Sequence, residues 1–178
     1  ICDSSLNLPM ENIFDLAKLR EDNSKLCEIS SLAIKKKYRG LSGEVFFPFT
    51  RYMWNFAYHF LDVDYFVIAV NPSMSELYEA VFLFEQLPMK SNVENYDFAN
   101  NNPAVGQYCN LKTSFDRFEK QYKNAKIEKN FYYFMKNPGA FNDNFPKQEF
   151  YLQDFSTVKA GWLKELFPFL LESTLKQQ

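Results

Sequence analysis

Apolar residues form two nearly continuous runs that are bounded by charged or turn-forming residues. The first run, Leu26 to Ile34, ends at three lysines, and the second, Tyr65 to Val70, ends at Asn71-Pro72. Short and almost uninterrupted apolar runs are typical of strands that are covered on both faces. An Asn-Pro pair breaks regular structure because the proline has no N–H to donate. Two buried central strands are therefore predicted.

Helical spacing follows the first predicted strand. Tyr52, Phe56 and Phe60 recur every four residues, which predicts a helix that ends at Phe60 and starts near Ser42 or at Phe47. This helix is apolar on nearly every side. It is therefore expected either to pack in a core or to line a cavity.

A second helix is predicted after the second strand. It begins at a cap formed by Ser73 or Ser75 and continues through Phe84, with Leu77 and Val81 on its apolar side. The order strand, helix, strand, helix with short connections indicates neighbouring strands of one sheet with helices packed on it.

The flanking regions carry weaker patterns. Residues 9–20 predict one short helix. Residues 86–98 and 104–111 predict two strands that pair as a hairpin. From Ser114 onward the spacing of aromatic residues becomes helical, and a last helix or two is expected within residues 155–175.

These elements together predict an α+β protein with a mixed central sheet flanked by helices. No stretch rich in Gly, Ser or Pro divides the 178 residues, so one domain over 1–178 is predicted. Its core is expected at 26–111 and a helical C-terminal extension at 114–178.

Composition narrows the classes of function. The formal net charge of −2 argues against a general nucleic-acid binder. The three cysteines show no Cys-x-x-Cys spacing and no signal peptide is visible, so a reducing, cytoplasmic protein is predicted. The chain has a single histidine, His59, which argues against a metal site. A Ser-His or Cys-His catalytic pair would have to use this one histidine. No apolar run is long enough for a transmembrane segment.

The turn after the first strand carries the sharpest charge feature of the chain. It begins with the lysines 35–37 and continues through Arg39 to a glycine-bearing stretch. Backbone N–H groups in such a turn and a following helix N-terminus can hold a phosphate. The candidate residues for this role are Lys37, Arg39, Gly40, Leu41, Ser42 and Gly43. The same run is also compatible with an ordinary solvated turn.

Three segments of the chain resemble a known family in order and spacing. They are the strand Cys27 to Ile34 (Cys-Glu-Ile-Ser-Ser-Leu-Ala-Ile), the loop Lys37 to Ser42 (Lys-Tyr-Arg-Gly-Leu-Ser), and Val70-Asn71-Pro72 with the helix Leu77 to Glu85. Residues 26–111 resemble the later part of the GCN5-related N-acetyltransferase (GNAT) fold. More narrowly, they are similar to N-acyl amino acid synthases and acyl-homoserine lactone synthases.

The chain departs from the family pattern at several points. Ser31 stands where those synthases usually carry Arg, Ser42 replaces the last small residue of the loop, and Leu83 replaces a glycine near the helix end. The helix end is therefore expected to be capped in another way. The strands that open a GNAT fold are not found in the sequence, so the sheet is expected to begin at its middle.

The resemblance implies an acyltransferase that moves an acyl chain, long in our expectation, from a thioester to an amine such as an amino acid. The donor is coenzyme A or the 4'-phosphopantetheine of an acyl carrier protein, and no metal is involved. Glu28 is implied as the general base, Tyr78 as the general acid, and Asn71 as a hydrogen-bond partner of the donor arm. The helix 47–60 would help to shape the acyl tunnel.

Each of these roles has a structural alternative, and so does the function. Glu28 can instead pair with a neighbouring cation, Tyr78 can be a core tyrosine, and Asn71 can simply form the turn before Pro72. The departures at Ser31 and Leu83 also suit a catalytically degenerate module that binds an acyl or nucleotide ligand. A helix-rich interaction domain without a ligand is the third alternative.

Overall fold

The computed structural model describes residues 7–21, 23–38, 45–90 and 102–137. The chain divides into two compact units, Ile1–Asp143 and Asn144–Gln178, and all of the described residues belong to the first. The single domain over 1–178 therefore stays a prediction. The predicted helices of 155–175, together with the turn residues Arg39, Gly40, Leu41, Ser42 and Gly43, lie outside the described residues.

The described residues form one four-stranded mixed sheet in the order β1-β2-β4-β3. The strands are β1 (Leu26–Ile29), β2 (Tyr65–Val70), β3 (Glu85–Gln86) and β4 (Val105–Asn110). β1 lies parallel to β2, and β4 lies antiparallel to both β2 and β3. The mixed α+β architecture predicted from the sequence is confirmed. The predicted pairing of 86–98 with 104–111 is found only at its start, where β3 pairs with Gln107 and Tyr108 of β4. Residues 87–90 form no strand of the sheet, and 91–98 lie outside the described residues.

The first strand is shorter than predicted. β1 ends at Ile29, and Ser31 adopts a left-handed backbone conformation with φ of 58°. A left-handed residue cannot continue an extended strand. Residues 30–34 therefore leave the sheet, although they are as apolar as a strand interior. The prediction of a strand over 26–34 is wrong for its second half.

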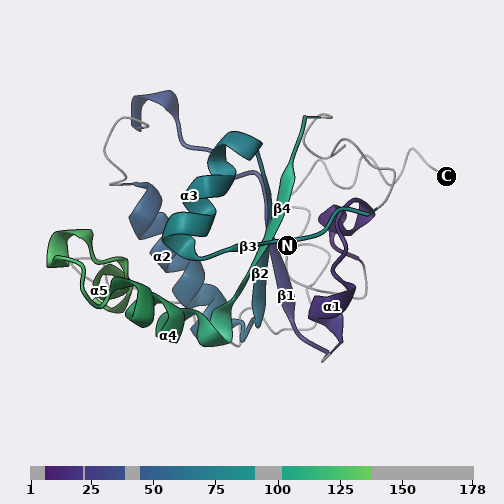
Figure 1. The fold of residues 1–178 in the computed structure, drawn as a ribbon. Helices are drawn as coiled ribbons and strands as arrows, with labels where there is room; N and C mark the ends of the chain where they lie inside the picture. Colours follow the sequence, from purple (N-terminus) through teal and green to yellow (C-terminus); the bar gives the residue numbers. More distant parts are fainter. Residues whose placement is uncertain (1–6, 22, 39–44, 91–101, 138–178) are drawn as a thin grey trace, which may run out of the picture. The chain divides into compact units, whose positions relative to one another are not determined.

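Helices cover one face of the sheet, here called the front face (Figure 1). They are α2 (Phe46–Asn55), the π-helical stretch η3 (Phe56–Phe60), α3 (Pro72–Phe82), α4 (Leu111–Tyr122) and α5 (Phe131–Lys136). Short 3-10 turns, η2 (Lys36–Tyr38) and η5 (Ile127–Lys129), lie in the connections. The front core is strongly aromatic and includes Trp54, Phe66, Phe82 and Phe118, each at most 2 % exposed.

The N-terminal segment covers the opposite face, here called the back face. It consists of η1 (Pro9–Asn12) and α1 (Ala17–Arg20), so the single helix predicted over 9–20 is wrong. Between the two pieces the backbone pairs with another segment: Phe14 bridges Met89, and the Asp15 N–H donates to the Pro88 carbonyl at 2.9 Å. These bonds replace helical ones and hold the segment on the sheet.

Helix α3 starts and ends in ways that the sequence pattern did not predict. Its cap is Asn71, whose side-chain oxygen accepts from the Ser73 N–H at 3.0 Å, and not Ser73 or Ser75. Its end is closed by Leu83, which adopts the left-handed conformation with φ of 57° in place of a glycine. The Arg117 guanidinium donates to the Leu83 carbonyl at 2.8 Å and so satisfies a group that the helix leaves unbonded.

Candidate active site

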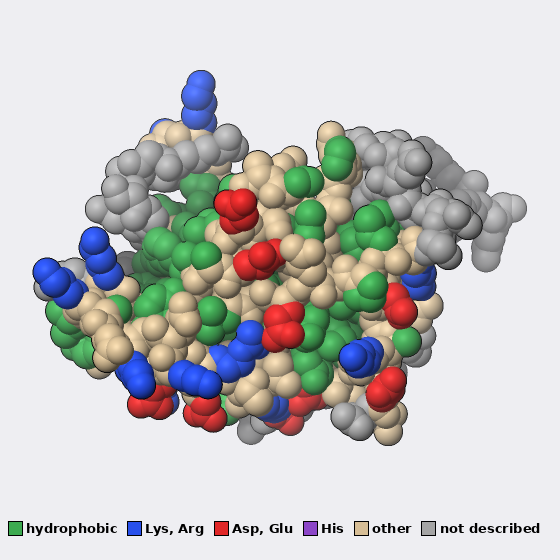
Figure 2. Space-filling model, in the orientation of Figure 1, with side chains coloured by type: hydrophobic (Ala, Val, Ile, Leu, Met, Phe, Trp, Pro, Cys, Tyr) green, Lys and Arg blue, Asp and Glu red, His purple; other side chains and the backbone are tan. Residues whose placement is uncertain are grey.

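The two parallel strands separate at their carboxyl ends and leave a cavity. β1 pairs with β2 only as far as Ile29 with Ile68, so Ala69 and Val70 have no partner on β1. The cavity has a volume of about 570 Å³. Residues 29–34 form one wall, the end of β2 forms another, and α2 and α3 close it with Phe46, Thr50, Trp54, Tyr78 and Phe82. Figure 2 shows hydrophobic side chains gathered over the region of α2 and α3.

Tyr78 lies in the wall of this cavity on α3. Its ring packs edge-on against Phe46 and Phe84, with centroids 6.5 and 5.7 Å away. Burial raises the pKa of the Tyr78 hydroxyl above its ordinary value, because the phenolate loses its hydration. Among the residues that the structure describes, no hydrogen-bond partner of this hydroxyl is found. Tyr78 is therefore a protonated, half-buried residue of the cavity wall, and no bond to a described residue occupies its hydroxyl.

Tyr122 shows what a tyrosine with a purely structural bond looks like in this fold. Burial raises its pKa as well, but its hydroxyl donates to the Val81 carbonyl at 3.0 Å. Burial raises the pKa of both tyrosines, so the difference between them is the hydrogen-bond partner of the Tyr122 hydroxyl.

Asn71 also lines the cavity, at the end of β2. Its side-chain oxygen is engaged as the cap of α3, accepting from both the backbone N–H and the hydroxyl of Ser73. The sequence alternatives of turn former and ligand contact are therefore not exclusive, since the capping oxygen leaves the amide nitrogen as the group that can donate to a ligand.

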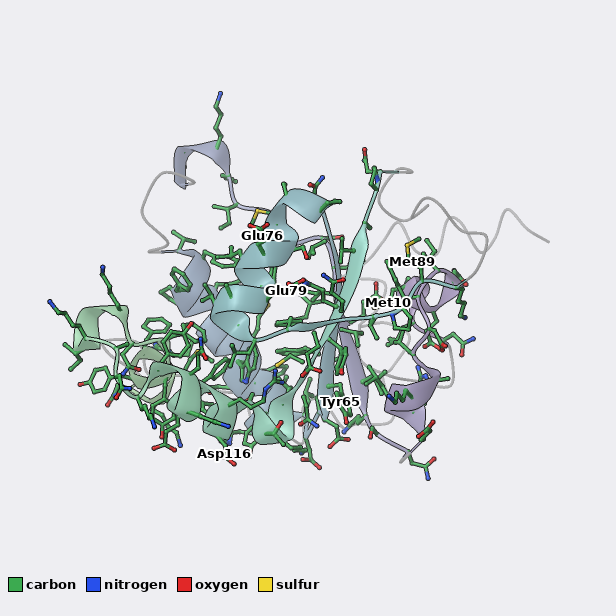
Figure 3. All side chains as sticks on the ribbon, in the orientation of Figure 1. Met10, Tyr65, Glu76, Glu79, Met89 and Asp116 are labelled. Atoms are coloured by element: carbon green, nitrogen blue, oxygen red, sulfur yellow. The ribbon has the colours of Figure 1, made fainter. Side chains whose placement is uncertain are left out.

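Glu28 lies on the back face and does not line the cavity. It is 1 % exposed, and its Oε2 accepts from the Met10 N–H at 3.1 Å. Figure 3 shows Met10 on the side of α1, opposite the helices of the front face. The structure thus brings Tyr78 and Asn71 together at the cavity and places Glu28 behind the sheet, one residue before the strands separate.

Lys37 lies in η2, exposed, at the end of the segment that leaves β1. It does not line the cavity. The remaining residues of the predicted phosphate-binding turn, 39–43, lie outside the described residues, so this part of the prediction remains a prediction.

Helix α2 lines the cavity, but not with the aromatic side predicted from the sequence. Tyr52, Phe56 and Phe60 stack on one another, with centroids 6.3 and 5.0 Å apart, and none of the three lines the cavity. The lining residues are instead Phe46, Thr50, Met53 and Trp54. Positions 46, 50 and 54 have the same four-residue spacing as the aromatic stripe, so the sequence contained this signal too.

His59 lies away from the cavity on η3. It is exposed and borders a separate hollow of about 530 Å³ with Lys112, Asp116 and Lys136. Within the described ranges, no group of three or more His, Cys, Asp or Glu side chains is placed to hold a metal ion. No helix in these ranges has both the length and the apolar character of a membrane span.

Comparison of the fold with solved structures places the chain among known architectures. The structure is similar to that of FeeM, an N-acyl amino acid synthase from uncultured soil microbes, with a TM-score of 0.52 and 23 % sequence identity. The match covers 65 % of this chain and 60 % of that chain, so the chain spans less than two thirds of the solved relative. This likeness shows a shared mixed α/β fold.

The sequence profile of a protein family then identifies the family. Residues 1–110 match the family described as "N-acyl amino acid synthase FeeM". The chain therefore belongs to the FeeM family of N-acyl amino acid synthases, which confirms the resemblance inferred from its motifs. No functionally curated protein matches the chain.

Proposed function

We propose that this chain is an N-acyltransferase that moves an acyl group from a thioester donor to an amine, such as the amine of an amino acid. The observation that carries the proposal is the cavity between the separating strands, with Tyr78 in its wall. Membership of the FeeM family supports the same class of reaction. The donor is the phosphopantetheine arm of coenzyme A or of an acyl carrier protein.

The separated strands suit an extended arm. Beyond Ile68, β2 has no β1 partner, so the arm can lie beside it and pair its amide groups with the backbone as an added strand would. The apolar walls formed by Trp54, Phe66 and Phe82 suit the hydrocarbon chain. Lys37, Arg39, Gly40, Leu41, Ser42 and Gly43 are proposed to hold the phosphates, and Asn71 to donate to the arm.

In the proposed reaction the amine nitrogen attacks the thioester carbonyl carbon, a C–N bond forms and the C–S bond breaks. The departing thiolate takes a proton from Tyr78, which is protonated at neutral pH. The proton lost by the amine is proposed to go to Glu28. Glu28 pairs with Val67, one residue before the last pair of β1 with β2, so it lies near the end of the slot but on the other face of the sheet.

The same geometry is compatible with a degenerate module that binds the thioester without turnover. The left-handed conformation of Ser31, a position where the related synthases usually carry Arg, is the observation that favours this second function. Cys109, a buried cysteine that is not in a disulfide, is compatible with a reducing environment in either case.

Two measurements test the proposal. Long-chain acyl-coenzyme A and the matching acyl carrier protein are each added to the protein, and the melting temperature is recorded; a rise is expected for the donor that is bound. Release of free thiol is then followed while amino acids are supplied. Binding without amine-dependent thiol release identifies the degenerate module, and no binding of either thioester contradicts both functions.

The variant Tyr78→Phe tests the proposed acid. It is expected to lower the turnover number by about 10²–10⁴-fold with little change in donor affinity, because the proton donor is removed and the ring is kept. Tyr122→Phe is the matched control, since it removes a similarly buried hydroxyl outside the cavity. Equal loss of activity in both variants would show that Tyr78 has only a structural role.

A further inference from the structure

A second hollow opens to the surface beside the cavity. It has a volume of about 410 Å³ and shares residues 29–34 and Met53 with the cavity. Its outer side is formed by Val45 and Phe49 of the α2 region. Leu32, Val45 and Phe49 are 37, 39 and 45 % exposed, and these three side chains are here called the apolar rim.

Large apolar side chains that are exposed singly are normal on protein surfaces, but a contiguous group marks an interaction surface. The apolar rim is such a group, because all three side chains border one hollow. Met74, which is 41 % exposed, adds a further apolar side chain at the adjoining cavity.

The charge next to the apolar rim is positive. Lys35 lines the same hollow, and Lys36 and Lys37 follow it in η2, all three exposed. The stretch 29–53 contains five basic residues and one acidic residue, Glu44, in a chain whose net charge is −2. In Figure 2 a basic side chain projects at the top of the view, where η2 lies in Figure 1. Basic and apolar groups are therefore combined at one place.

We propose that this surface docks on an anionic lipid bilayer, with the apolar rim inserted at the level of the head groups and the lysines against anionic lipid. Stable attachment to a bilayer needs two signals, and a short apolar insertion combined with a basic cluster supplies both. An acidic protein would also attract the lysines. The bilayer is favoured because the rim side chains surround an open hollow. Fluid lipid can fill such a hollow, whereas a protein partner would need a surface of complementary shape.

The docking has a consequence for lipophilic ligands. Residues 29–34 form a wall of both the hollow and the cavity, so an acyl chain can pass between the bilayer and the cavity along an apolar path. This route rests on the proposed acyl transfer, whereas the docking itself does not.

Sedimentation with lipid vesicles tests the docking, with the whole chain and no donor present. Vesicles of phosphatidylcholine alone are compared with vesicles that also contain phosphatidylserine. We expect binding only to the anionic vesicles, reduced by salt. Lys35→Gln with Lys36→Gln is expected to reduce the partition coefficient by about 25-fold, at about fivefold for each lysine.

Val45→Ser with Phe49→Ser tests the apolar part of the surface. Both residues border the hollow and not the cavity. Val45 is the N-cap residue of α2 and makes no side-chain cap bond, so serine is well tolerated there. This variant is expected to lose vesicle binding and to keep its melting temperature and its thiol release in vesicle-free solution. Met89→Ser with Ile127→Ser, two residues exposed elsewhere, is the control that keeps vesicle binding.

Three outcomes would overturn the proposal. The first is no binding to anionic vesicles, and the second is equal loss in the rim variant and in the control. The third is unchanged vesicle binding in the rim variant together with lost transfer from the carrier protein but not from coenzyme A, which would identify a protein docking surface. Because vesicle binding and thiol release are measured separately, failure of the docking leaves the proposed transfer standing, and the reverse also holds.

Discussion

The two faces of the sheet are built from alternate residues of the same strands, yet they are covered differently, and the cavity described above lies on the front face. On β2, Phe66 and Ile68 face the helices, and Val67 faces the N-terminal segment. The back face is closed by short turns that are bonded to their neighbours, including Met10 to Glu28 and Asp15 to Pro88. The front face is covered by helices that stand apart where β1 departs.

This difference shows that the cavity does not arise from a special composition. Both faces are apolar, and the front face has the larger aromatic side chains. The cavity exists because Ser31 turns β1 away from β2 while α2 and α3 still span the gap. The following predictions test this contrast between a closed and an open face.

The largest effect is expected from truncation on the closed face. Phe14 is 1 % exposed, and Phe14→Ala is expected to lower the free energy of unfolding by about 3–5 kcal/mol, because a cavity forms in a packed site. Met53 borders the existing cavity, so Met53→Ala is expected to lower the free energy of unfolding by only about 1 kcal/mol. Urea denaturation measures both values. Similar losses for the two variants would contradict the contrast.

A second prediction concerns the contact between Phe14 and the sheet. A Cβ added at Gly106 would lie only 2.5 Å from the Phe14 ring, so Gly106→Ala is expected to destabilise the fold by about 1–3 kcal/mol. The double variant Gly106→Ala with Phe14→Leu is expected to lose less than the sum of the single variants. Additive losses in the denaturation midpoint would show that the two residues do not share one site.

The sequence predicted the strands of this sheet well where burial alone decides, and poorly where a single backbone angle decides. β2 was predicted over its full length because Tyr65 to Val70 is apolar and ends at Asn71-Pro72. β1 was predicted too long, because nothing in the apolar run shows that Ser31 is left-handed. The left-handed cap at Leu83 was missed for the same reason. The cap at Asn71 was missed because it was assigned to Ser73 or Ser75, although Asn followed by Pro is a favoured start of a helix.

Some features of the candidate site could likewise be predicted from the sequence, and others could not. Tyr78 lies at the cavity as expected from the motif order. The placement of Glu28 behind the sheet could have been inferred, since it alternates with Cys27 and Ile29, and alternate strand residues point to opposite faces. What no pattern could supply is the N-terminal cover over Glu28, because the bond from Met10 joins residues 18 positions apart.

A third prediction uses groups on β4 whose pKa is raised. Burial raises the pKa of the Cys109 thiol from 9.0 to about 12, and burial with a hydrogen bond to Glu85 raises that of Tyr108 from 10.0 to about 12. The folded state then holds protons that the unfolded state has lost. Stability should be unaffected by these groups below about pH 9 and fall as the pH rises toward 12, by at most about 1.4 kcal/mol per pH unit for the buried Cys109 and by less for Tyr108, which is partly screened by solvent.

Thermal unfolding measured at closely spaced alkaline pH values checks this slope, and Cys109→Ala is expected to make it shallower. A thiol reagent at pH 8 provides a second check, since native Cys109, which is 1 % exposed, should react far more slowly than in the unfolded chain. An unchanged slope in the variant would contradict the role given to Cys109.

The smallest effect is expected at the residue that opens the cavity. Ser31 is exposed and left-handed, a conformation that costs a non-glycine residue about 1–2 kcal/mol. Glycine removes this cost but adds about 0.5–1 kcal/mol of chain entropy in the unfolded state. Ser31→Gly is therefore expected to stabilise the fold by about 0.5–1 kcal/mol. The neighbouring Ser30 has no positive φ, so Ser30→Gly should destabilise it by a similar amount. The denaturation midpoint is expected to rise for Ser31→Gly and to fall for Ser30→Gly. Changes in the same direction would contradict the left-handed turn at Ser31, by which the open face is here distinguished from the closed one.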